Sequence, residues 1–384
     1  METVRKTYKH KLKPTPAQQR MLDDGLWRCR DLYNVALEQR KSWWERGQGR
    51  SATRFQQEAE LKEIRAAFPE YAAIHSHVLQ DVLARLDTTY QAFFRRLAAG
   101  EQPGFPRFQG RNRYHSFTFK EYGNGARLDN GYLVLSRIGR IALRWSRPLT
   151  GAIKTVTISR EADGWYVSFS CAEVPVQPLP PTGRETGIDV GLKVFLITAD
   201  GETIENPRHY RKAEKCLAKA QQRLARRKKG SKRREKARRL VARHHQKVRR
   251  QRQDFHHKGA LYLVRHYDTS FIEDLRVANM VRNHHLAKSI SDAGWGQFRT
   301  TLEYKAACAG KQVVLVPPAY TSQDCSACGK RVKKSLSVRT HVCPSCGFIA
   351  DRDQNAAMNI LRAGQAPRGA VGPPAVVKRE SVGL

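Results

Sequence analysis

Four of the eight cysteines occur as two Cys-x-x-Cys pairs, and this pattern constrains the fold more than any other feature of the chain. Cys325 and Cys328 form the first pair, Cys343 and Cys346 form the second, and fourteen residues separate the pairs. The Cys-x-x-Cys turn aims two thiolates at one metal, and the glycine that follows each pair is expected to free the backbone there to donate to the sulfurs. Disulfides are the alternative, but the reducing compartment expected for this chain disfavours them. The pattern predicts a Zn²⁺ site that is structural because all four ligands are cysteines.

Positive charge is the second constraint. The 384 residues include 70 Lys and Arg against 35 Asp and Glu, which gives a formal charge of +35. Self-repulsion of this size disfavours a small-metabolite enzyme and favours a polyanionic partner. The sequence has no run of about 18 apolar residues, so no membrane span is predicted. Met1–Gln19 has no apolar signal segment. We expect a nucleic-acid partner, no membrane and a cytoplasmic location. A basic membrane-surface protein is the disfavoured alternative, since no long basic amphipathic helix accompanies an apolar anchor.

More than half of the excess charge lies in one segment, Arg208–Lys258. This segment contains 22 lysines and arginines, three acidic residues and no proline. Its break at Gly230 and Ser231 predicts two long helices joined by a short turn, with a narrow apolar seam that repeats every seven residues. Solvated helices usually mix both signs of charge to form i,i+4 pairs, and this segment does not. Phosphate groups are therefore its expected partner.

Three carboxylates stand in unusual contexts. Asp189 interrupts an apolar, strand-like run, Glu273 ends another, and Asp353 opens a helix with an apolar face. A carboxylate in a buried strand is costly unless something positive compensates it. Each has an ordinary alternative, because Asp351 or Asp353 alone suits a helix cap and Glu273 alone suits a solvated strand end. Together, in the order strand hairpin, strand, helix, they predict an RNase H-like nuclease core that binds two Mg²⁺ ions.

Several local elements follow from periodicity. We expect a strand over residues 3–12, then a helix that begins at a Thr15–Gln18 capping box. A second helix runs from Leu79 to Gly100, and a hairpin occupies residues 156–169. A further strand is expected over residues 312–316.

The motifs around the acids and cysteines resemble those of TnpB, the transposon-encoded RNA-guided DNA endonucleases regarded as ancestral to type V CRISPR effectors. Residues 187–192 read Gly-Ile-Asp-Val-Gly-Leu, residues 272–275 read Ile-Glu-Asp-Leu, and the cysteine ribbon runs into Asp-Arg-Asp-Gln-Asn-Ala-Ala-Met-Asn-Ile. Weaker signatures occur at 8–15, 29–34, 93–96 and 103–108. The resemblance covers about residues 3–364. It implies that Asp189, Glu273 and Asp353 are RuvC-type Mg²⁺ ligands, with Asp353 preferred to Asp351 because of its spacing from the Asn-Ala-Ala motif.

The resemblance also implies a multidomain α+β fold. Its parts are an RNase H-like (RuvC) α/β nuclease core with an inserted four-cysteine zinc ribbon, and an N-terminal β-barrel wedge domain that carries a helical recognition insertion. The expected ranges are 1–10 and 106–180 for the wedge, 11–105 for the helical lobe, 183–320 and 350–364 for the core including the basic hairpin 208–258, and 321–349 for the ribbon. Residues 365–384 lack periodicity and are expected to form a disordered tail.

The implied activity is Mg²⁺-dependent hydrolysis of target DNA beside a short flanking motif, directed by a guide RNA from the transposon end, with one protein per RNA in a prokaryotic, nucleoid-associated setting. Two alternatives stay open: a catalytically silent RNA-guided repressor, and a DDE-like transposase acting on transposon ends. Gln80 is a candidate for one base contact because amides read adenine well. The candidate phosphate contacts are Arg107, Arg111, Arg226, Arg227, Lys228, Lys229, Arg233 and Arg234.

Overall fold

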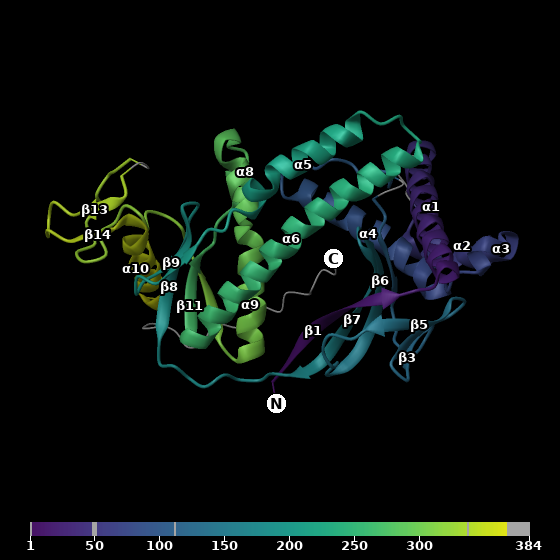
Figure 1. The fold of residues 1–384 in the computed structure, drawn as a ribbon, viewed down its shortest axis with the longest axis horizontal. Helices are drawn as coiled ribbons and strands as arrows, with labels where there is room; N and C mark the ends of the chain where they lie inside the picture. The colour runs from purple at the N-terminus through teal and green to yellow at the C-terminus, as the bar shows by residue number, and fades with distance from the viewer. Residues whose placement is uncertain (1, 48–51, 111–112, 336–337, 367–384) are drawn as a thin grey trace. The chain divides into compact units, whose positions relative to one another are not determined.

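The computed structural model describes residues 2–47, 52–110, 113–335 and 338–366, and its contacts divide the chain into two compact units, Met1–Pro175 and Val176–Leu384. Each unit has its own sheet and its own helices (Figure 1). The two units are considered separately below.

The first unit contains a seven-stranded antiparallel sheet in the order β2-β6-β7-β1-β5-β4-β3. The strands are β1 (Thr3–Lys13), β2 (Ser116–Phe119), β3 (Ala126–Asp129), β4 (Tyr132–Leu135), β5 (Gly139–Arg144), β6 (Ala152–Glu161) and β7 (Gly164–Pro175). The expected hairpin is confirmed as β6 and β7. β1 pairs with β7 and β5, although more than a hundred residues separate it from both. The observed element is thus a sheet, and its description as a wedge barrel stays a prediction.

Four helices accompany this sheet: α1 (Pro16–Arg46), α2 (Arg54–Ala67), α3 (Pro69–Ala72) and α4 (Ser76–Ala98). The predicted capping box is confirmed, because the Thr15 hydroxyl accepts the backbone N–H of Gln18 while the Gln18 side chain accepts that of Thr15. Leu22 and Leu79 from the helices share one buried cluster with Phe169 from β7. β1 continues to Lys13, so the expected domain boundary after residue 10 falls inside a strand.

The second unit contains a five-stranded sheet in the order β10-β9-β8-β11-β12. The strands are β8 (Glu185–Val190), β9 (Val194–Thr198), β10 (Thr203–Glu205), β11 (Thr269–Glu273) and β12 (Gln312–Val316). β8, β9 and β10 form an antiparallel meander, whereas β11 lies parallel to β8 and β12. The parallel pairing of β8 and β11 brings the carboxyl ends of both strands to one edge of the sheet. The predicted strand over residues 312–316 is confirmed.

Helices cover both faces of this sheet. They are α5 (His209–Ala225), α6 (Lys232–His266), α7 (Val277–Met280), α8 (His284–Ala293), α9 (Trp295–Ala309) and α10 (Arg352–Gln365). Ile188 and Val190 of β8 pack with residues of α6 and α9. The opposite face of β8 packs on α10 so closely that a Cβ on Gly187 would lie 2.0 Å from the carbonyl oxygen of Ala357. Side chains alternate along a strand, so Asp189 shares the α10 face with Gly187.

The two long basic helices predicted for 208–258 are α5 and α6, which pack against each other and meet at a turn around Gly230. Between β12 and α10 lies the cysteine segment, which contains β13 (Thr340–Val342) and β14 (Ile349–Asp351). α10 ends at Gln365, and the expected tail from residue 367 onward lies outside the described residues. Within the described ranges, no helix is long and apolar enough to cross a membrane.

Candidate functional site

The three predicted carboxylates come from three separate elements of the second unit. Asp189 is the penultimate residue of β8, Glu273 is the last residue of β11, and Asp353 is the second residue of α10. Glu273 is buried, and Asp189 and Asp353 are partly buried. Since β8 and β11 are parallel neighbours and α10 packs on β8, the fold brings the three acids to one region, as the sequence predicts.

The electrostatics of these acids show that they influence one another. Burial, followed by the nearby charges of Glu273 and Asp353, raises the pKa of Asp189 to about 8, while Arg352 opposes the shift. Burial also raises the pKa of Glu273, against the effect of a 2.6 Å hydrogen bond from the Thr321 hydroxyl. Like charges in a buried place are costly unless a cation binds between them, so Asp189 and Glu273 are suited to binding a divalent ion.

Asp353 and Asp351 have different roles at the start of α10. The Asp351 carboxylate caps the helix, accepting the backbone N–H groups of Asp353 at 2.8 Å and Gln354 at 3.3 Å. Asp353 instead pairs with two arginines: its Oδ2 lies 3.1 Å from Nη1 of Arg339, and its Oδ1 lies 2.9 Å from Nη2 of Arg352. Two guanidinium groups thus neutralise the carboxylate that the sequence favours as the third ligand.

The donor chemistry of the three acids fits Mg²⁺, which prefers carboxylate oxygens. The binding of two Mg²⁺ ions by these acids stays a prediction.

The raised pKa of Asp189 predicts how stability depends on pH without added Mg²⁺. The unfolded carboxyl loses its proton near pH 4, whereas the folded one keeps it until about pH 8. The folded state therefore loses stability as pH rises through this window. Asp189→Asn should melt at a higher temperature than the wild type at pH 9, with the difference shrinking toward pH 4. Added Mg²⁺ should stabilise the wild type more than the variant. Equal melting at pH 9 would contradict the shift.

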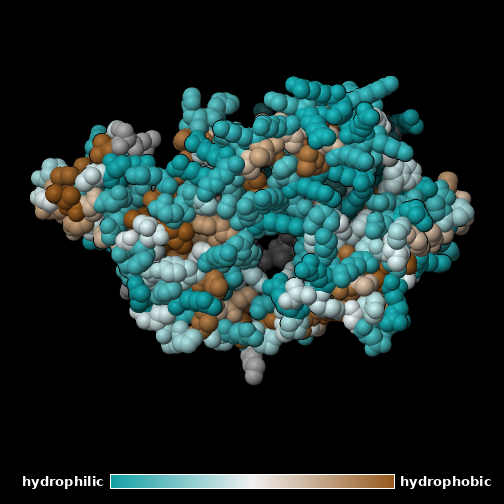
Figure 2. All heavy atoms as spheres, viewed as in Figure 1, coloured by the Kyte–Doolittle hydropathy of each residue, from teal (hydrophilic) through white to brown (hydrophobic). Residues whose placement is uncertain are grey.

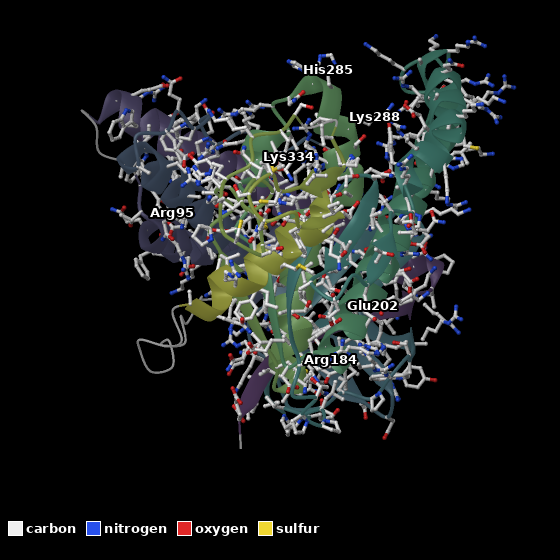
Figure 3. All side chains as sticks on the ribbon, turned by 90° about the vertical axis from the view of Figure 1, so that its left-hand side faces the viewer. Arg95, Arg184, Glu202, His285, Lys288 and Lys334 are labelled. Carbon is white, nitrogen blue, oxygen red and sulfur yellow. The ribbon has the colours of Figure 1, made fainter. Side chains whose placement is uncertain are left out.

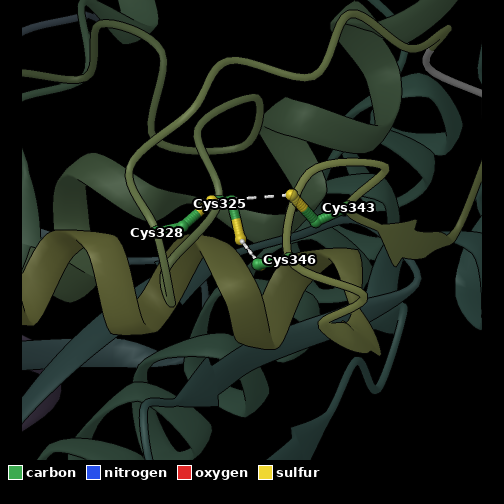
Figure 4. Close-up of side chains that lie close together, drawn as sticks. All are labelled: Cys325, Cys328, Cys343 and Cys346. Atoms are coloured by element: carbon green, nitrogen blue, oxygen red, sulfur yellow. Dashed lines mark hydrogen bonds between the residues drawn. The ribbon is translucent and has the colours of Figure 1, made fainter.

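The four cysteines form a second site (Figure 4). Sγ of Cys325 lies 3.7 Å from Sγ of Cys346, Sγ of Cys328 lies 3.6 Å from Sγ of Cys343, and all four sulfurs group within 4.8 Å. A tetrahedral zinc ion with Zn–S bonds of about 2.3 Å places its sulfurs about 3.8 Å apart. All four cysteines are free thiols. The cluster therefore fits Zn²⁺ in both donor type and spacing.

Both cysteine pairs are built on the same turn. Gly329 donates to the carbonyl of Cys325 at 2.8 Å, and Gly347 donates to that of Cys343 at 2.9 Å. Both glycines have positive φ, 76° and 73°, which residues with a Cβ rarely adopt. The turn therefore explains a glycine after each pair, and its expected role of freeing the backbone to donate to the sulfurs stays a prediction.

Side-chain amides of α10 attach the cysteine ribbon to the helix that carries Asp353. Asn355 accepts the backbone N–H of Ser326 at 2.9 Å and donates to the carbonyl of Asp324 at 2.8 Å. Asn359 donates to the carbonyls of Thr321 and Asp324 at 2.8 and 2.7 Å. Asn355 is fully buried, so these bonds are costly to lose. The ribbon thus helps to fix the start of α10.

The predicted nucleic-acid contacts lie on or after α4 in the first unit and around the α5–α6 turn in the second. Gln80 is half-buried on α4, Arg107 is exposed in the segment after α4, and Arg111 lies outside the described residues. The other six residues are in the α5–α6 turn or at the start of α6, within the hydrophilic surface of these helices that Figure 2 shows. Arg234 differs from the rest, because its guanidinium donates to the carbonyls of Leu224 and Arg227 at 3.0 and 2.7 Å. It closes the turn, and its role as a phosphate contact stays a prediction.

Sequence reasoning missed the groups that position the acids. Asn355 and Asn359 interrupt the apolar face of α10, and a buried amide there was a usable signal. Thr321, which bonds Glu273, and Arg339, which pairs with Asp353, carried no local signal, because each meets its partner only in the fold.

Comparisons with known proteins show which family the chain belongs to. Family models match the chain at residues 168–284 ("Probable transposase"), 295–360 ("Cas12f1-like, TNB domain") and 1–49 ("Helix-turn-helix domain"). The described part of the last range folds as β1 followed by one continuous helix, α1.

Two curated relatives share most of the chain. A protein of Streptomyces pristinaespiralis named "Putative RNA-guided DNA endonuclease" is 38% identical over 95% of this chain and 91% of its own. "Putative RNA-guided DNA endonuclease InsQ" of Escherichia coli K12 is 33% identical over 76% of this chain and 75% of its own. A solved structure titled as a Cas12f1–sgRNA–target DNA complex has the same fold, with a TM-score of 0.58 and 13% identity over 93% of this chain and 98% of that one. The chain therefore belongs to the TnpB family.

Proposed function

We propose that this protein is an RNA-guided DNA endonuclease that hydrolyses target DNA with Mg²⁺ bound by Asp189, Glu273 and Asp353. The observation that carries the proposal is the meeting of these acids, whose charges act together on the pKa of Asp189. The names of the two relatives support the same activity. Proteins that hold guide RNA and DNA also need a large positive surface, and the charge of +35 provides it.

The side chains of the site would bind metal, bind DNA phosphate or orient a metal ligand. Asp189 and Glu273 hold metal from the strand ends, and Asp353 completes the set from α10. Bound Mg²⁺ supplies charge stabilisation to the attacking and leaving oxygens of the phosphodiester. Arg339 and Arg352 must release Asp353 when it binds metal, which leaves two guanidinium groups beside the site to bind DNA phosphate. Thr321 holds Glu273 in its orientation.

The domain assignment belongs to this proposal. Residues 183–320 and 350–364 would form the RuvC-type core, 321–349 the zinc ribbon, and 1–10 with 106–180 the wedge around the lobe 11–105. Guide RNA from the transposon end and double-stranded target DNA are the partners, with one protein per RNA, in a prokaryotic cytoplasm at the nucleoid. The two alternatives, a silent repressor and a DDE-like transposase, have less support, because all three acids are present and together and the relatives are named as guided endonucleases.

A plasmid-library experiment tests this function. The protein is expressed with the structured transcript from the 3′ end of its gene, whose guide end is rewritten to match a target flanked by random sequence. Guide-dependent loss of plasmids that share one flanking motif is the expected result. Binding of the target without cutting by the wild type would instead establish the repressor, and guide-independent joining of transposon ends would establish the transposase.

A further inference from the structure

A small basic pocket lies at the surface of the second unit, outside the carboxylate and cysteine sites. Its volume is about 190 Å³, and its lining includes Lys193, Asn206, Arg208, Arg211, Lys288 and Asp292. These residues come from the β8–β9 turn, the β10–α5 connection, the first turn of α5, and α8. Drug-sized ligands need about 300 Å³ or more, so this volume suits a smaller group, such as a phosphate with part of its sugar.

The cations of the pocket have few partners of their own. Across the described residues, the side chains of Lys193, Arg208 and Arg211 make no hydrogen bond or ion pair. Lys288, labelled on α8 in Figure 3, pairs with Glu214 at 2.6 Å. Three like charges around one hollow repel one another and strengthen the local positive potential. That repulsion favours the binding of an anion.

The one acid in the pocket is already engaged. The carboxylate oxygens of Asp292 lie 2.9 and 3.1 Å from the backbone nitrogen of Tyr210, which donates its N–H to them from the first turn of α5. Asp292 therefore accepts one of the backbone N–H groups that have no partner within the helix at the start of α5. The three unpartnered cations remain for a ligand.

The backbone holds the cations in place. Arg208 has a left-handed conformation, with φ +48°, which is uncommon for a residue with a Cβ. Asn206 stabilises this arrangement, because its Oδ1 accepts the N–H of Arg208 at 3.1 Å and its Nδ2 donates to the carbonyl of Leu192 at 2.9 Å. Strained residues of this kind cluster at binding sites. The same amide thus connects the two segments that carry Lys193 and Arg208.

The pocket is close to the carboxylate region along the chain. Lys193 follows Asp189 by four residues, across the turn between β8 and β9. Four residues span at most about 14 Å. Asp189 faces α10, whereas the pocket borders α5 and α8. A nucleic-acid strand that contacted both the pocket and the carboxylates would therefore pass over the end of the sheet.

We propose that this pocket binds a backbone phosphate of a nucleic-acid strand held by the protein. The inference rests on the proposed function, because it takes its ligand from the RNA or DNA of that function. The shared chemistry is a phosphodiester, which Lys193, Arg208 and Arg211 would neutralise with charge-assisted hydrogen bonds. The strand is either the guide RNA or the target DNA, and the experiment separates these two sources.

The test compares two double variants that remove the same charge. Lys193→Gln with Arg211→Gln empties the pocket of two unpartnered cations and spares Arg208, whose backbone is strained. Arg140→Gln with Lys154→Gln is the control, because each of these cations of β5 and β6 is already paired with an acid and neither belongs to the basic segment 208–258. In the first arm, guide RNA binding is measured from 50 to 400 mM KCl. In the second arm, target DNA binding by the guide-loaded complex is measured over the same range.

We expect the pocket variant to lower the slope of log affinity against log salt by about one unit in one arm, and the control to leave both slopes unchanged. A change in the first arm assigns the phosphate to the guide RNA, and a change in the second assigns it to the DNA. Unchanged slopes in both arms, or equal changes in the control, would overturn the inference. Guided cleavage by the wild type, measured in parallel, shows whether the proposed function itself stands.

A second measurement locates the phosphate and checks the fold. Neutral methylphosphonate linkages are placed one at a time along the strand that responds. At one linkage, the neutral substitution should lower the affinity of the wild type but should not lower the affinity of the pocket variant any further. If every linkage lowered the affinity of the pocket variant as much as that of the wild type, a defined phosphate site would be refuted. The RNA-free pocket variant should melt at or above the wild-type temperature at low salt, because like-charge repulsion has been relieved. A lower melting temperature would contradict the charge argument.

Discussion

Replacing Asp189 by Asn will lower guide-directed DNA cleavage by at least about a thousand-fold and will leave guide RNA binding unchanged. The carboxylate is a proposed ligand of metal ions that would contribute several kcal/mol to the transition state, and each 1.4 kcal/mol is a factor of ten in rate. Asn keeps the shape of the side chain but loses the charge. Single-turnover cleavage of a matched linear DNA measures the rate, and a gel-shift titration measures RNA binding.

The Asp-x-Asp motif at the start of α10 offers a matched control for this result. Asp353→Asn should lose cleavage to a similar extent, because it removes the third proposed ligand. Asp351→Asn should cleave normally, because Asn caps a helix about as well as Asp. The two variants remove the same charge two residues apart. Equal loss in both, or cleavage that survives Asp189→Asn, would refute the ligand assignment.

Loss of the zinc site will have the second large effect. Cys325 is fully buried, and structural zinc contributes about 10–16 kcal/mol to folding in small zinc-finger peptides. Cys325→Ser should therefore unfold the ribbon and release the hydrogen bonds that Asn355 and Asn359 make with it. The start of α10 then loses its support. We expect bound zinc to fall from one ion per chain to well below one, with cleavage falling at least about a hundred-fold.

A thiol outside the ribbon controls for this substitution. Cys216 is exposed on α5, so Cys216→Ser should retain one zinc ion and full cleavage. Zinc is counted by mass spectrometry under native conditions. A Cys325→Ser protein that keeps its zinc, or that cleaves normally without it, would show that the ribbon does not support the carboxylate site.

Local elements could be predicted from the sequence because their causes are local. The Thr15–Gln18 capping box, the hairpin of β6 and β7, and the two basic helices each depend on residues close together in the chain. The cysteine pairs and their glycines were equally readable. The meeting of the three acids was expected from their order among the elements, and from the resemblance to TnpB.

Other features depend on contacts between distant residues and could not be read in advance. β1 lies between β5 and β7, so its strand extends past the expected domain boundary. Arg339 reaches Asp353 only because the ribbon folds back beside α10. The basic pocket gathers four segments, and the nearness of its cations could not be read from a sequence that places Lys193 and Lys288 far apart. In each case the missing information was three-dimensional.

Exchange of guides between targets is the measurement that tests the central claim most directly. Two guide RNAs that differ only in their guide segment are loaded separately, and each complex receives two plasmids that carry the matching targets beside the same flanking motif. With Mg²⁺, each complex should linearise only the plasmid that matches its guide, and the preference should reverse when the guides are exchanged. Cutting that ignores the guide, or the absence of cutting by both correctly loaded complexes, would contradict the account.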